Sequence, residues 1–267
     1  MNALSARPSP CARSALSQRR AGRPCRPLRA ASTPDSAPKD PFAEKTEHKD
    51  NLLDRAFIYL FAKKMSDQLG GKMPRKGTLT DYEGFVDISR LIMAGRNSPQ
   101  QRDAVRGVLM SIMPEGAPAQ FRKLFPPTKW SCEFNAWITT VFFKWLVGPS
   151  ELKEVEIEGP KGEPEVWKSG VQIKKCRYLE NSGCTGMCVN MCKLPTQSFF
   201  TDDFGLPLTM NPNFEDLSCE MIFGQAPPPI EEDEAYQQPC FVGKCSVPGS
   251  DNKDRPCPKI DTERNKK

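Results

Sequence analysis

The chain has 267 residues, of which 38% are hydrophobic, so it can form one compact domain with a buried core and tails. Its formal charge of +5 arises in the first 34 residues, which contain seven arginines and no acidic residue. The remainder carries 31 basic and 33 acidic residues, so its charge gives no reason to expect a nucleic-acid surface.

Residues 1–34 have the composition of an organelle transit peptide, being basic, acid-free and rich in serine. They lack the apolar core of a secretory signal, and the small residues Ala30, Ala31 and Ser32 suit a processing region. A disordered tail is the alternative, and composition alone does not separate plastid from mitochondrion. We expect a polar linker over residues 35–50.

The first half of the chain shows helical periodicity after this linker. Apolar residues repeat at helical spacing over residues 51–69 and again over 81–94. A third helix is predicted to start with Ser98 as its N-cap and to stop at Pro114. We therefore assign residues 51–129 to a helical region.

The pattern changes in the second half. An aromatic helix over 131–147 is apolar almost all round, which predicts a buried central helix. Alternating segments at 151–158 and 165–173 then predict a β-hairpin, and the sequence beyond is rich in cysteine and proline. The expected fold class is α+β, with a mainly helical first half, a small hairpin and a Cys-rich C-terminal segment before a polar tail at 246–267.

No apolar stretch approaches the roughly 20 residues that a membrane-spanning helix requires. The longest one lies between Glu133 and Lys144. If the ligand is a lipid, the protein is therefore expected to take it from a membrane surface or from a carrier.

Eight of the eleven cysteines lie between residues 176 and 257, and three of them, Cys184, Cys188 and Cys192, are equally spaced. Residues four apart share one face of a helix, so Cys188 and Cys192 can bind one metal or cluster. In a regular helix Cys184 would lie about 12 Å from Cys192 along the axis, too far to share it. The polar and glycine-containing residues 181–186 predict a turn that folds Cys184 over the start of the helix instead.

Three interpretations of these cysteines remain open: ligation of a metal or iron–sulfur cluster, disulfides, and unreactive buried thiols. The helix N-terminus and nearby basic side chains are expected to favour the ligating thiolate form. The basic side chains are Lys174, Lys175 and Arg177. The candidates for a fourth ligand are Cys176, Cys219, Cys240 and Cys245.

The chain contains a single histidine, His48, which lies in the linker and is expected to be exposed. A multi-histidine iron site, a histidine-based zinc hydrolase site and a Ser-His-Asp triad are thereby excluded. Any metal must be bound by sulfur, by carboxylate or by a substrate.

Residues 175–228 carry a resemblance to a known family and read KCRYLENSGCTGMCVNMCKLPTQSFFTDDFGLPLTMNPNFEDLSCEMIFGQAPP. This stretch resembles the C-terminal domain of the plastid β-carotene isomerases of strigolactone biosynthesis. The segment EDEAYQQPCFVGKC, residues 232–245, is similar to the same family, as is the aromatic helix more loosely. The resemblance covers residues 130–245, which we assign to a carotenoid isomerase-like domain.

The resemblance implies a plastid enzyme that uses iron and interconverts all-trans- and 9-cis-β-carotene. Since such a substrate is a lipid and no segment spans a membrane, we expect peripheral contact with plastid membranes. Four cysteines match the motif, and their role as ligands of mononuclear iron or of an iron–sulfur cluster follows from sulfur chemistry. These are Cys184, Cys188, Cys192 and Cys219. The alternatives are a non-catalytic plastid metal- or iron–sulfur-binding protein and a thiol redox regulator.

The aromatic residues of the 131–147 helix are candidates for lining a polyene channel, although packing in the core is an equally valid interpretation of each one. They are Phe134, Trp137, Phe142 and Phe143. No catalytic residue is assigned from the sequence.

Overall fold

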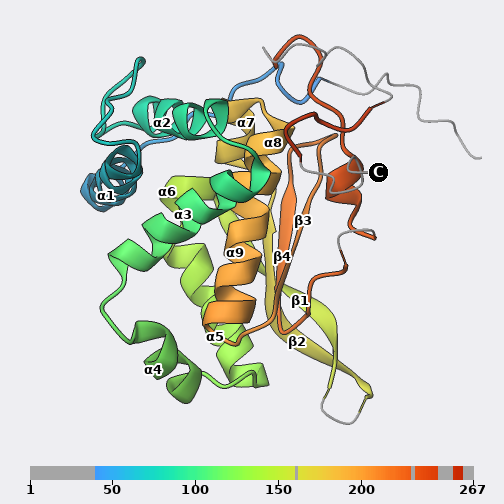
Figure 1. Cartoon of the computed structure of the whole chain (residues 1–267). Coiled ribbons are helices and arrows are strands. Elements are labelled where there is room, and N and C mark those ends of the chain that lie inside the picture. Colours follow the sequence, from blue (N-terminus) through green and yellow to red (C-terminus); the bar gives the residue numbers. More distant parts are fainter. Residues whose placement is uncertain (1–39, 160–161, 230–231, 246–254, 261–267) are drawn as a thin grey trace, which may run out of the picture. The chain divides into compact units, whose positions relative to one another are not determined.

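The computed structural model describes residues 40–159, 162–229, 232–245 and 255–260, which belong to one compact unit. The fold is α+β, as the sequence predicts. Helices occupy the first half, and a four-stranded antiparallel sheet together with a second helical segment forms the rest (Figure 1). The predicted transit peptide lies outside the described residues.

The first three helices match their predicted ranges: α1 is Leu52–Gln68, α2 is Tyr82–Ala94 and α3 is Ser98–Ile112. The side chains of Asn51 and Asp81 cap the first two by accepting hydrogen bonds from backbone N–H groups of the first turn. Local capping and apolar periodicity thus agree on where these helices begin.

The predicted cap of α3 is displaced by one residue. The Asn97 side chain accepts a hydrogen bond from the Gln100 N–H at 3.0 Å, and the Gln100 side chain accepts one from the Asn97 N–H at 3.1 Å. This reciprocal pair satisfies two free amides, so Asn97 is the cap rather than Ser98. The Ser98 hydroxyl lies 2.9 Å from Asn190 Oδ1, which ties α3 to the helical segment that carries the cysteines.

Three more helices complete the first half: α4 at Ala117–Leu124, α5 at Lys129–Phe142 and α6 at Lys144–Val147. The prediction that the aromatic helix is buried all round is wrong. Trp130 and Trp137 of α5 are 60% and 48% exposed, because α5 packs on the sheet through small and polar side chains. The buried aromatic residue of this region is Trp145, which is 2% exposed and contacts rings from α1 and α2.

The sheet has the strand order β1-β2-β4-β3 and is antiparallel throughout. Strands β1 (Ser150–Glu158) and β2 (Pro164–Ile173) form the predicted hairpin. Strands β3 (Leu208–Pro212) and β4 (Cys219–Phe223) were not predicted from the sequence. Because Cys219 pairs with Ile173, the sheet places one of the candidate cysteines at the end of β2.

A second set of helices follows the hairpin. After α7 (Arg177–Ser182), a continuous helical segment contains α8 (Thr185–Met187), η1 (Cys188–Lys193), α9 (Leu194–Ser198) and η2 (Phe199–Asp203). The segments η1 and η2 are π-helical, a conformation that is rare and often found at functional sites. Figure 1 shows the α8–α9 segment between α3 and strands β3 and β4.

A buried cation connects this helical segment to the sheet. Lys193 of η1 has a side chain that is 2% exposed, and its Nζ donates to the Met210 carbonyl oxygen of β3 at 2.7 Å. The same ammonium pairs with the Asp233 carboxylate at 2.7 Å, and Asp233 caps the 3₁₀ turn η3 (Glu234–Gln237). One charge therefore holds three segments together.

A second buried cation fixes the linker. Arg177 pairs with Asp50 at 2.6 Å, donates to the Trp145 carbonyl oxygen at 2.9 Å and lies 3.7 Å above the Tyr82 ring. His48 lies beside this group. The sequence-based expectation that it is exposed is wrong, because His48 is half-buried. Burial, together with the charge of Arg177, lowers the pKa of His48.

We predict that Lys193→Met lowers the free energy of unfolding by about 3–5 kcal/mol, because it leaves the Asp233 carboxylate buried without its partner. Urea unfolding followed by circular dichroism measures this. The matched control is Lys153→Met, which removes a pair whose lysine side chain is 50% exposed and should cost less than about 1 kcal/mol. Equal losses for the two variants would contradict the prediction.

Candidate functional site

A small internal cavity of about 10 Å³ is lined by four cysteines from three elements. Cys176 is the N-cap residue of α7, Cys188 and Cys192 lie on η1, and Cys219 begins β4. Among the other lining residues, the charged one is Lys193. We call this space the thiol cavity.

Backbone geometry brings these elements together. The Leu217 carbonyl oxygen accepts a hydrogen bond from the Cys176 N–H at 2.7 Å, two residues before Cys219. Leu217 is fully buried and adopts a left-handed backbone, with φ of 63°, which is uncommon and costly for a residue with a branched side chain. This strained turn places the start of β4 against the start of α7.

The structure divides the cysteines that the sequence grouped together. Cys188, Cys192 and Cys219 line the thiol cavity, and Cys176, one of the four candidates for a further ligand, joins them. Cys184 points elsewhere, and its thiol lies 3.6 Å from the Met93 sulfur. The turn before η1 therefore directs Cys184 away from the other motif cysteines instead of over them.

Cys184 belongs with the cysteines of the C-terminal segment. A Cβ at Gly186 would stand 3.9 Å from the Cys184 sulfur and 3.3 Å from that of Cys257, so a glycine there allows the two elements to approach closely. Burial and the neighbouring thiols of Cys257 and Cys245 raise the pKa of Cys240. The chain thus holds a second group of thiols, apart from the thiol cavity.

Burial dominates the electrostatics of the thiol cavity. It raises the pKa of the Cys176, Cys188 and Cys219 thiols, and it raises that of Cys192 to about 12. The positive charge of Lys193 opposes this effect at Cys188 and Cys219 without overcoming it. The four thiols are therefore protonated at neutral pH in the metal-free chain.

The basic residues expected to favour thiolate do not do so, because their charges are used elsewhere. Lys175 pairs with the buried Glu180 at 2.8 Å, and Arg177 pairs with Asp50. Lys174 is exposed and lies 3.3 Å from Glu151.

An apolar pocket of about 70 Å³ adjoins the thiol cavity. Cys192 lines both spaces, and so does Tyr178. The remaining lining residues come mainly from the N-terminal helices and are Phe61, Met65, Phe85, Ser89, Val105, Val108, Leu109, Leu146, Met191 and Thr196. Cys192 is thus the cysteine of the cavity that an apolar ligand could contact.

The aromatic residues proposed to line a channel lie on another part of the molecule. Trp137 and Phe142 are 48% and 44% exposed on the outer face of α5, and Phe134 and Phe143 are half-buried beside them. The residues at the apolar pocket are instead Phe61 and others on α1, α2 and α3. Helical periodicity marked their apolar faces but could not show that these faces meet Cys192.

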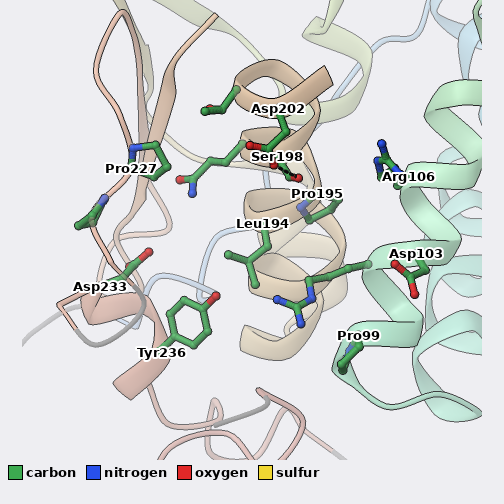
Figure 2. A pocket seen from close by; sticks show the side chains of 14 residues that line it. Pro99, Asp103, Arg106, Leu194, Pro195, Ser198, Asp202, Pro227, Asp233 and Tyr236 are labelled. Carbon is green, nitrogen blue, oxygen red and sulfur yellow. Dashed lines mark hydrogen bonds between the residues drawn. The ribbon is translucent and has the colours of Figure 1, made fainter. Parts of the chain in front are cut away.

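A third space is polar and lies on the other side of α9 from the apolar pocket. This open pocket of about 380 Å³ is lined by Asp103 and Arg106 of α3, by Asp202 and by the C-terminal segment (Figure 2). The Ser198 hydroxyl donates to Asp202 at 2.5 Å, and Arg106 pairs with Asp203 at 2.5 Å. Its charged lining suits a polar ligand rather than a hydrocarbon.

No three cysteine, histidine, aspartate or glutamate side chains within the described ranges already form a metal-ligand group. The thiol cavity supplies four soft sulfur donors, but in this structure they are not grouped closely enough to hold a metal ion. No helix in the described part of the chain is long and apolar enough to cross a membrane.

Comparison with known proteins identifies the family. The family described as "Beta-carotene isomerase D27-like, C-terminal" matches residues 145–232. A relative from Medicago truncatula named "Beta-carotene isomerase D27, chloroplastic" is 39% identical over 76% of this chain and 79% of its own length. A protein of the same name from Arabidopsis thaliana is 40% identical over 72% of this chain and 70% of its own length.

The chain belongs to the D27-like β-carotene isomerase family. The matched stretch of this D27-like protein contains all four cysteines of the thiol cavity and ends before Cys240. Most of the apolar pocket lies outside that stretch, on α1, α2 and α3. A search of solved structures finds no match.

The raised pKa of Cys192, about 12, predicts its reactivity in the metal-free protein. Because the thiolate is the nucleophile, the rate of alkylation by iodoacetamide should rise about tenfold per pH unit from roughly pH 7 to pH 10. Mass spectrometry of the Cys192 peptide measures this rate. The same chain unfolded in urea is the control, in which the rate should level off near the ordinary cysteine pKa of about 8.5. An early plateau in the folded protein would show that the thiol is not suppressed by burial.

Proposed function

We propose that this protein is an iron-dependent plastid enzyme that interconverts the all-trans and 9-cis isomers of β-carotene. Two relatives carry the name of a chloroplastic β-carotene isomerase, which supports the substrate and the compartment. The observation that carries the proposal is that Cys192 lines both the apolar pocket and the thiol cavity. A hydrocarbon in the pocket would therefore contact a residue of the candidate metal site.

The apolar pocket suits part of a polyene. Aromatic and aliphatic side chains from α1, α2 and α3 surround it, and the polar groups among them are the hydroxyls of Ser89, Tyr178 and Thr196. Its volume of about 70 Å³ is below the roughly 300–1,000 Å³ of ordinary ligand pockets. A carotenoid can enter only if lining side chains such as Met65 and Met191 move apart, and methionine is well suited to such movement.

The four thiols of the cavity are a soft, water-shielded donor set that suits iron. The cavity of about 10 Å³ has the size of a single ion, so an iron–sulfur cluster would require its walls to move apart. We propose Cys176, Cys188, Cys192 and Cys219 as the iron ligands, so that Cys176 replaces Cys184 in the set inferred from the sequence. Bound iron would supply one-electron chemistry, which lowers the double-bond character of a polyene and so the barrier to rotation.

The protein's own contribution is to place one double bond of the substrate beside Cys192 and to keep water away. Burial raises the pKa of Tyr178, so this hydroxyl stays neutral beside the hydrocarbon. With no charged side chain among the residues that line the pocket, proton transfer to the polyene is not favoured there. Selectivity for one bond would come from the fixed position of the polyene.

The acid-free leader and the chloroplastic relatives together support import into plastids. Peripheral contact with plastid membranes, where carotenoids are dissolved, completes the proposal. A 9-cis product would place the enzyme in strigolactone biosynthesis.

The first test separates the two groupings of cysteines. Replacing Cys188, Cys192 or Cys219 by serine should lower iron affinity by at least about tenfold and reduce isomerase activity with it, because the harder oxygen is a poor substitute for thiolate. Metal analysis, visible absorption and isomer analysis of β-carotene are the measurements. The matched control is Cys184→Ser, which should keep iron because its thiol lies beside Met93.

Loss of iron in Cys184→Ser but not in Cys176→Ser would favour the grouping inferred from the sequence. Iron-loaded protein that leaves all-trans-β-carotene unchanged would favour a non-catalytic metal-binding protein.

The second test fills the apolar pocket without touching the cysteines. Leu109→Trp should lower kcat/KM for β-carotene by at least about tenfold, because the larger side chain displaces the polyene from Cys192, while iron content stays unchanged. Met110→Trp is the matched control, since Met110 is the next residue of α3, is 36% exposed and does not line the pocket. Equal activity of the two variants would argue for a different substrate path.

A further inference from the structure

Helix α5 presents its apolar side chains outward. Against the sheet it buries small and polar residues, among them Ser131, Asn135 and Thr139. Trp130, Phe134, Trp137 and Val141 follow one another at intervals of four, three and four residues, which places them on one face of the helix. Trp130 is 60% exposed, Trp137 48% and Val141 49%, so both tryptophans are in contact with solvent.

The apolar surface continues onto neighbouring elements. The Phe125 ring at the end of α4 lies 5.7 Å from the Trp130 ring and almost parallel to it. Lys129 Nζ donates to the Val166 carbonyl oxygen of β2 at 2.9 Å, which holds the start of α5 against the hairpin. We call this surface the aromatic face; it comprises Leu124, Trp130, Phe134, Trp137 and Val141. Figure 1 shows α4, α5 and the β1–β2 hairpin at the same, lower end of the view.

Exposed cations border the aromatic face. Lys123 precedes Leu124, Lys129 precedes Trp130, and Lys144 lies three residues after Val141. The nearby carboxylates of Glu133 and Glu165 accept hydrogen bonds from neutral groups, the Lys168 N–H at 2.9 Å and the Trp167 indole at 3.0 Å, and so keep their charge. The positive charge is concentrated on the helical side, where α4, α5 and α6 carry Arg122, Lys123, Lys129 and Lys144 against one carboxylate, Glu133.

We propose that the aromatic face docks the protein onto an anionic lipid surface. Exposed tryptophans beside lysines are the combination found where helices lie in the headgroup region of a bilayer, with apolar side chains in the lipid and cations at anionic headgroups. The inference rests on the proposed function to this extent: a hydrocarbon substrate is dissolved in membranes. A second copy of the chain is a less suitable occupant, because like lysines would face one another.

The test is binding to carotenoid-free vesicles. The seven arginines of the leader would themselves bind anionic lipid, so the protein is prepared from residue 35, which keeps the compact unit 40–267 intact. Flotation with vesicles of phosphatidylcholine, with and without phosphatidylglycerol, should show binding that requires the anionic lipid and weakens in salt. The fluorescence of the exposed tryptophans should shift to the blue on binding.

The double variant Trp130→Ser, Trp137→Ser should lower the partition coefficient by at least about tenfold. Lys123→Gln and Lys144→Gln should each lower it about fivefold. The matched control is Leu52→Ser, Tyr59→Ser on α1, which removes two side chains that are 86% and 46% exposed and should leave binding unchanged. Thermal unfolding checks each variant, and the lysine variants keep the test decisive if the tryptophan variant unfolds.

Vesicle binding that is equal in the wild type, the tryptophan variant and the lysine variants would overturn the proposal. So would a wild-type dimer in gel filtration that the tryptophan variant abolishes, since the aromatic face would then be covered by a second copy. These outcomes are independent of catalysis. A protein that binds vesicles but does not isomerise β-carotene would contradict the proposed function and leave the docking surface in place.

Discussion

The structure depends on one buried ammonium group. Lys193 lies on the same π-helical segment as Cys188 and Cys192, and it holds that segment to β3 and to Asp233. A buried charge is tolerated only when it is paired and hydrogen-bonded, so the positions of these three elements are linked. The arrangement of the cysteines therefore follows from a contact made by the residue next to them.

Two opposing environments meet at this segment. On one side the cysteines surround a space too small for more than about one water molecule, and burial keeps their thiols protonated. On the other side helices α1, α2 and α3 supply an apolar pocket that reaches Cys192. A metal site so placed would be shielded from water while remaining accessible to a hydrocarbon, which is the property that the proposed isomerase requires.

Sequence patterns predicted the elements better than their surroundings. Helices α1 to α3 and the β1–β2 hairpin follow local periodicity and capping, which are visible in the chain itself. The exposure of Trp137 was missed because periodicity gives the faces of a helix but not which of them is covered. The separation of Cys184 from Cys188 was missed as well, since it depends on Met93 and on the C-terminal segment. Strand β4 was missed because its pairing with β2 is non-local, with α7, the α8–η2 helical segment and β3 between the two strands.

The apolar pocket also bears on how the protein can be divided. The stretch that matches the C-terminal family domain, residues 145–232, contains the four cysteines of the thiol cavity, whereas Phe61, Phe85 and Val108 come from helices that precede it. A fragment trimmed to that stretch would retain the sulfur ligands and lose most of the walls that orient a substrate. If the apolar pocket holds the substrate as proposed, the stretch matched by the C-terminal family domain is smaller than the unit that selects it, and the N-terminal helices would carry preferences for different carotenoids.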